Sequence, residues 1–176
     1  MNRTDLCVCC VALGFLGAFA GRPAFCATPM SDQKFVDFAA QTDMVEANLG
    51  DLAQNVGKSQ AVKDYGQMLA ADHTNDYRKL QSAAQQAGLT VPTAIDSQHD
   101  KSTVGPMHAL KGAAFDRKFD HEMVAGHAEA IAIYKKEAAD GQNPALKAYA
   151  QETLATLDKH LDDAKNLEQG KPPAGQ

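Results

Sequence analysis

Residues 69–80 read LAADHTNDYRKL and carry the apolar stripe of a helix, interrupted by charged groups. The stripe runs from Val62 to Leu80 at the three-and-four spacing of a single helix face. His73 and Asp76 occupy that same face, where apolar side chains would be usual. The pattern therefore predicts a helix whose inner face carries an ionisable imidazole.

The composition favours an all-α protein with one hydrophobic core. The chain has 176 residues, contains no tryptophan and few aromatic residues, and is rich in alanine, which suits helices packed closely through small side chains. Its formal net charge is -5, and no stretch interleaves lysine or arginine with aromatic residues. These features argue against a nucleic-acid partner and against binding to anionic membrane surfaces.

Residues 1–26 are typical of a secretory signal peptide. The apolar run from Leu6 to Ala20 is shorter than the roughly 20 residues that span a bilayer, so we expect no stable membrane span after cleavage. Small residues favour cleavage after Cys26, with cleavage after Ala20 as the rival position. A lipoprotein is disfavoured because the large Phe25 precedes Cys26. The mature protein is expected to be exported, to a periplasm.

The cysteines support this expectation about the mature chain. All four lie in the leader region, so cleavage after Cys26 leaves none and cleavage after Ala20 leaves one. Neither case permits a disulfide framework or a site made of several thiolates. The hydrophobic core alone must stabilise the mature domain.

Four long helices are predicted, and together they form a four-helix bundle. Gly57 and Gly88 end the first two, and residues 89–111 between the second and third lack periodicity and predict a long crossover with one or two helical turns. The bundle is expected over residues 27–168, and residues 169–176 are expected to be a disordered tail. The predicted helices cover residues 32–56, 60–87, 112–140 and 144–167.

Each predicted helix carries one inward group that can bind a metal ion: Glu46, His73, His127 and His160. Within each hairpin the two groups lie at similar distances from the turn, so they should meet at one level of the bundle. Three imidazoles and one carboxylate suit iron, manganese, zinc or copper, whereas calcium and magnesium require more oxygen ligands. The pattern predicts a transition-metal site that serves metal capture or handling.

Three aspartates lie one turn from these groups. His73 is followed at plus three by Asp76 and His160 by Asp163, while Asp43 lies one turn before Glu46. Each aspartate could be a further ligand or could orient a ligand from a second layer. The alternative is that all these side chains form a metal-free polar core, in a non-enzymatic stress or structural protein of the cell envelope. The remaining histidines, His99, His108 and His121, are assigned to loops or the surface.

The segments FVDFAAQTDMVEANLGDLA, VKDYGQMLAADHTNDYRKL, GAAFDRKFDHEMVAGHAEAIAIYKKEA and LKAYAQETLATLDKHLDDA occur in this order. This succession resembles the bacterial family called domain of unknown function 4142, over about residues 32–168. The resemblance implies an exported protein with a ferritin-like four-helix bundle. It does not indicate which activity or which protein partner the family has.

A comparison with ferritin-like diiron proteins separates this chain from that class. Those proteins carry a glutamate three residues before each of two histidines. Here the corresponding positions hold Ala70 and Leu157, and His127 stands where a bridging glutamate would be expected. An oxidoreductase that uses bound iron or manganese is therefore disfavoured. The chain also lacks motifs for hydrolysis or nucleotide binding, which favours a protein that is not an enzyme.

Overall fold

The computed structural model describes residues 30–173, and the long helices begin at caps that the sequence supplies. Ser31 and Ser59 each accept a hydrogen bond from a backbone N–H of the first turn, and Asn143 accepts two. Gly88 closes the second helix with φ 68°, a left-handed conformation that favours glycine. The all-α prediction is confirmed, with long helices α1 (Asp32–Val56), α2 (Gln60–Ala87), α5 (Gly112–Asp140) and α6 (Pro144–Glu168).

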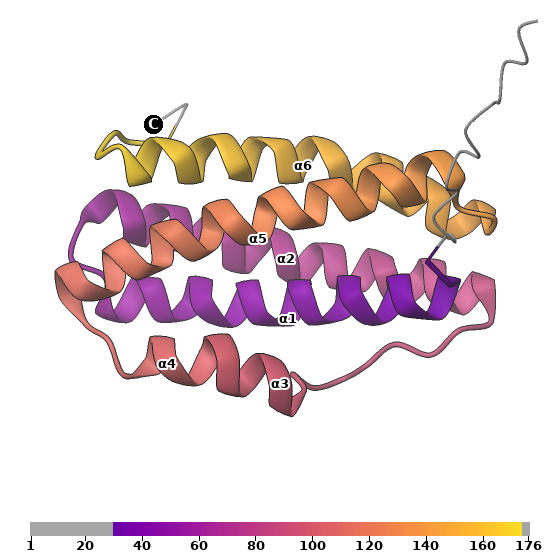
Figure 1. The fold of residues 1–176 in the computed structure, drawn as a ribbon, viewed down its shortest axis with the longest axis horizontal. Helices are drawn as coiled ribbons and strands as arrows, with labels where there is room; N and C mark the ends of the chain where they lie inside the picture. Colours follow the sequence, from indigo (N-terminus) through magenta and orange to yellow (C-terminus); the bar gives the residue numbers. More distant parts are fainter. Residues whose placement is uncertain (1–29, 174–176) are drawn as a thin grey trace, which may run out of the picture.

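The four long helices form a bundle of two antiparallel hairpins. α1 pairs with α2 and α5 pairs with α6, while α2 also packs on α6 and α1 on α5 (Figure 1). The connection between the hairpins returns along the whole bundle, so α5 starts at the end where α1 and α2 are joined (Figure 1). This confirms the predicted bundle with one long crossover, which is the connectivity of ferritin-like folds.

Within the crossover, three short helical pieces follow one another and pack against the bundle. They are α3 (Ser97–His99), the π-helical turn η1 (Asp100–Val104) and α4 (Gly105–His108). The crossover was predicted to contain one or two helical turns. The buried Gln41 of α1 fixes their approach, because its amide nitrogen donates to the Ala94 carbonyl at 3.1 Å and its amide oxygen accepts from Asp96 N–H at 2.9 Å.

Two local contacts set the spacing of the helices. At one end of the bundle, the Asp116 carboxylate of α5 accepts the backbone N–H groups of Lys58 and Ser59 at 2.8 and 2.9 Å. In the α1–α2 hairpin, a Cβ atom on Gly50 would lie 2.6 Å from the carbonyl oxygen of Gly66. The two glycines therefore allow the backbones of α1 and α2 to approach closely.

The hydrophobic core is divided into two clusters, one towards each end of the bundle. One contains Phe35, Leu80, Tyr134 and Leu146, and the other Leu49, Tyr65, Phe119 and Met107 among their fully buried members. Among residues 30–173, eleven polar or charged residues are buried as well. Several of these lie at the middle of the helices, between the two clusters, and form the candidate site.

Two sequence predictions concern the chain ends. The predicted signal peptide lies outside the described residues. Of the predicted tail, residues 169–173 are described, and Pro173 is buried there. No helix within residues 30–173 has the length and apolar character needed to cross a membrane.

Candidate metal centre

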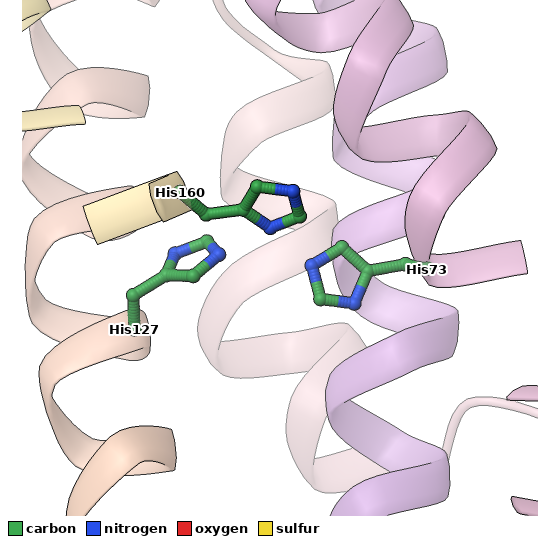
Figure 2. A group of neighbouring side chains, drawn as sticks. All are labelled: His73, His127 and His160. Atoms are coloured by element: carbon green, nitrogen blue, oxygen red, sulfur yellow. The ribbon is translucent and has the colours of Figure 1, made fainter. Parts of the chain in front are cut away.

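The four predicted ligands meet at the middle of the bundle, one from each long helix. Glu46 comes from α1, His73 from α2, His127 from α5 and His160 from α6, and all are buried. The centroids of the three imidazole rings lie 5.2 to 5.7 Å apart. Figure 2 shows the three rings turned towards one another from their separate helices. One ligand atom from each ring lies within 4.8 Å of the other two.

One nitrogen of each imidazole already has a partner on the outer side of the centre. His73 Nδ1 lies 2.9 Å from Asp43 Oδ1, and His160 Nε2 lies 3.0 Å from Asp72 Oδ2. His127 Nδ1 lies 2.8 Å from the Met123 carbonyl oxygen, which can only accept, so this nitrogen carries the proton. Such contacts fix the orientation of each ring and direct its other nitrogen inwards.

The remaining atoms converge on the middle of the site and are called the inner atoms below. Glu46 Oε2 lies 3.1 Å from both His73 Nε2 and His127 Nε2, but neither contact has the alignment of a hydrogen bond. Within residues 30–173 no hydrogen bond satisfies these three atoms or His160 Nδ1. Four buried polar atoms that point at one volume without hydrogen bonds are costly unless a cation or water occupies it.

The electrostatics of the centre divide the histidines into two kinds. Burial, reinforced by the neighbouring imidazoles, lowers the pKa of His160 to about 4, and burial also lowers the pKa of His127. Burial would lower the pKa of His73 too, but the Glu46 charge and the contacts with Asp43 and Glu46 raise it to about 10. At neutral pH, His127 and His160 are therefore neutral, while His73 carries a proton.

Of the four inner atoms, Glu46 Oε2 is the one that belongs to a carboxylate. Burial alone would raise its pKa, but the nearby His127 and His73 outweigh burial and lower it. The carboxylate is therefore ionised and can compensate a cation. With Ala70 and Leu157 at the positions of the diiron glutamates, the donor set fits one ion rather than a carboxylate-bridged pair.

Behind His73, the Asp43 carboxylate connects the centre to two buried tyrosines. Asp43 Oδ2 accepts from the Tyr149 hydroxyl at 3.4 Å, and the Tyr149 and Tyr134 hydroxyls lie 3.1 Å apart. Burial raises the pKa of Asp43 to about 6, although the contact with His73 opposes this. Both oxygens of Asp43 are thus held in place, as a residue that orients His73 requires.

The other two predicted aspartates, Asp76 and Asp163, each accept a hydrogen bond from a lysine. Asp76 is buried, and its carboxylate accepts from Lys79 Nζ at 2.7 Å. Asp163 is also buried and accepts from Lys159 Nζ at 2.7 Å. The carboxylates that contact His73 and His160 are instead Asp43 and Asp72. Asp72 is a functional candidate that the sequence analysis missed.

The three other histidines are not part of the group of ligand atoms at the centre. His108 and His121 are exposed, as predicted, and His121 Nδ1 lies 3.5 Å from Glu168 Oε1. His99 lies on α3 in the crossover, and is half-buried rather than fully exposed.

Comparisons with known proteins identify a family and a set of similar structures. A family model described as "Domain of unknown function (DUF4142)" matches residues 20–167. No curated protein matches the chain.

Solved structures of CopM resemble this fold. CopM in the Cu(II)-bound form has a TM-score of 0.67 and 14% sequence identity, covering 81% of this chain and 98% of that one. The Ag-bound form, obtained by co-crystallization, has a TM-score of 0.63, and the Cu(I)-bound form 0.65; each is 15% identical and covers 80% of this chain and 97% of that one. At such identities the likeness concerns the fold alone.

Proposed function

This chain belongs to the DUF4142 family, and on that premise we propose that it binds one transition-metal ion between its four long helices, for metal capture or handling. The proposed ligands are Glu46, His73, His127 and His160. The observation that carries the proposal is the set of four inner atoms, which are buried, converge on one volume and lack hydrogen bonds within residues 30–173.

The spacing of the inner atoms supports a four-coordinate ion. Metal–nitrogen distances of about 2.0–2.1 Å in a tetrahedral site place neighbouring ligand atoms roughly 3.3 Å apart. The two distances of 3.1 Å from Glu46 Oε2 to His73 Nε2 and His127 Nε2 are close to this value. The histidine ligand atoms lie within 4.8 Å of one another, so modest ring rotations would complete the site.

The donor set limits which metal the centre can take. Three imidazole nitrogens and one carboxylate oxygen suit copper, zinc, iron or manganese. Copper is the first candidate, because divalent copper binds such sites most tightly and because the similar CopM structures are named as Cu(II)-, Cu(I)- and Ag-bound forms.

Metal titration tests this proposal. The mature chain, purified without an affinity tag and washed with a chelator, is titrated with copper, zinc, iron and manganese. We expect one ion per chain, lost in His127→Ala and His160→Ala and retained in the control His108→Ala, whose side chain is exposed. Absence of binding in the natural chain, or unchanged binding in His127→Ala, would contradict the proposal.

One observation favours a second candidate, a structural protein with a metal-free polar core. His73 lies between the carboxylates of Asp43 and Glu46, at 2.9 and 3.1 Å, and a protonated imidazole there compensates their charge without a metal. This candidate predicts full thermal stability in a chelator and no gain in melting temperature on addition of metal. A metal-dependent rise in melting temperature favours the first candidate.

We further propose that the protein is exported to a periplasm after removal of residues 1–26. The support is the short apolar run from Leu6 to Ala20, followed by small residues. Mass spectrometry of the chain recovered from cell fractions tests this. We expect an exported protein that begins at Ala27, and a full-length chain retained in the cytoplasm would contradict it.

A further inference from the structure

Two recesses on different sides of the bundle reach the candidate metal centre. The first, called the α1–α5 groove, has a volume of about 220 Å³ and is bordered by the crossover; its lining includes Thr42, Glu46, His99, Glu122, Gly126 and Glu129. The second, called the α1–α2 recess, has a volume of about 280 Å³, and its lining includes Asp43, His73, Thr74, Tyr77, Arg78 and Gln81. Either could admit an ion, but they differ in what an ion would meet.

The α1–α5 groove leads to a carboxylate oxygen of the centre. A Cβ atom on Gly126 would lie 3.2 Å from Glu46 Oε1, so the missing side chain leaves this carboxylate facing the groove. Glu122 and Glu129 lie one turn before and one turn after Gly126 on α5, and both line the same groove. Gly126 is thus an opening in the α5 wall, with a carboxylate on each side of it.

The α1–α2 recess ends on atoms that are already engaged. It reaches Asp43 and His73, whose contact of 2.9 Å occupies the outer nitrogen of the ring, while the inner Nε2 faces the other way. The exposed Arg78 lines this recess and repels a cation that approaches it. Sterics and charge both favour the groove over the recess.

Resting on the proposed metal-binding function, we propose that a hydrated divalent cation reaches the centre through the α1–α5 groove. Glu122 and Glu129 attract the ion to the mouth of the groove, Gly126 leaves the way open, and Glu46 is the first ligand of the centre that the ion meets. Lys118 pairs with Glu122 from the preceding turn, but no lysine or arginine is among the residues that line the groove, so its lining keeps a surplus of negative charge. Such a surplus raises the local cation concentration and the association rate. The imidazoles then complete the coordination.

Stopped-flow mixing of the metal-free mature protein with Cu²⁺ measures the association rate, and equilibrium titration measures the stoichiometry. In Gly126→Leu we expect the rate to fall on the order of ten-fold, while one ion still binds at equilibrium. The matched control Thr74→Leu fills the α1–α2 recess and should associate at the natural rate. A natural rate in Gly126→Leu, or slow association in Thr74→Leu, would overturn the proposed route.

The charge of the groove gives an independent test that does not depend on how Gly126→Leu folds. We expect the double variant Glu122→Gln, Glu129→Gln to associate more slowly than the natural chain at low ionic strength, with the difference shrinking as salt is added. Equal rates at low salt would overturn the role of the carboxylates. If the natural chain binds no Cu²⁺ at equilibrium, the proposed function itself fails, whereas normal binding with unaltered rates overturns only the route.

Discussion

His73 Nδ1 of α2 lies 2.9 Å from Asp43 Oδ1 of α1, and both side chains are buried. The carboxylate of one helix therefore sets the orientation of the imidazole on its neighbour. We expect Asp43→Asn to weaken metal binding by about 10- to 100-fold, as loss of outer partners of ligating histidines commonly does. Competition with a chromophoric chelator measures the affinity.

Asp72 should act in the same way on His160, because its Oδ2 lies 3.0 Å from Nε2 of that ring. Asp72 is half-exposed, so we expect a smaller loss of affinity for Asp72→Asn than for Asp43→Asn. The control is Asp76→Asn, since the Asp76 carboxylate accepts a hydrogen bond from Lys79. An equal loss in Asp76→Asn would contradict the assignment of Asp43 and Asp72 as the orienting residues.

Removal of His73 should destabilise the metal-free protein more than removal of His127. In His73→Ala the buried carboxylates of Asp43 and Glu46 lose their shared cation, which typically lowers the free energy of unfolding by about 3–5 kcal/mol. His127→Ala removes a neutral ring and should cost less. Urea denaturation in a chelator measures both, and an equal loss would show that His73 does not compensate the two carboxylates.

Metal binding should release a proton from His73. Glu46 and Asp43 raise the pKa of His73 to about 10 against the effect of burial, whereas His127 and His160 are already neutral. Metal affinity should therefore rise with pH up to about 10, with about one proton released per ion near pH 7.5. Calorimetric titration in buffers of different ionisation enthalpy counts the protons, and no release would contradict a ligand role for His73 Nε2.

The same shift predicts the pH dependence of the metal-free fold. The pKa of His73 is higher in the folded chain than its ordinary value of 6.5. Its stabilising contribution is complete below pH 6.5 and is lost as pH rises through about 10. Denaturation midpoints of the natural chain and His73→Ala should therefore converge at high pH, and a constant difference between them would contradict this.

Gly66→Ala should destabilise the α1–α2 hairpin although alanine favours helices. A Cβ atom there would lie 2.7 Å from the Gly50 carbonyl oxygen and from Ala53 Cβ, so the helices must separate. We expect a loss of about 1–3 kcal/mol in the free energy of unfolding. Helix propensity alone would give a gain of about 0.8–1 kcal/mol, so the sign of the change in chemical denaturation decides between the two effects.

The level of the centre could be predicted from the sequence because antiparallel hairpins impose a simple register. Glu46 and His73 lie at similar distances from one turn, as His127 and His160 do from the other, and the structure brings all four together. The helix ends were equally predictable, because Ser31, Ser59 and Asn143 are strong caps. The role of these residues as ligands stays a prediction.

The outer partners of the histidines could be predicted only in part. Asp43 lies one turn before Glu46 on the same helix, so its spacing from a predicted ligand indicated it. Asp72 lies beside that stripe and reaches His160 on another helix, and the Met123 partner is a backbone carbonyl; neither leaves a periodic signal. The groove at Gly126 depends on how α1, α5 and the crossover pack together, which no single segment encodes.

The most direct test is anomalous diffraction at the copper absorption edge, from crystals of the mature protein loaded with Cu²⁺. We expect one strong peak within coordinating distance of Glu46 Oε2, His73 Nε2, His127 Nε2 and His160 Nδ1. A centre without a peak, with copper bound only at exposed histidines such as His108, would contradict the proposed metal centre.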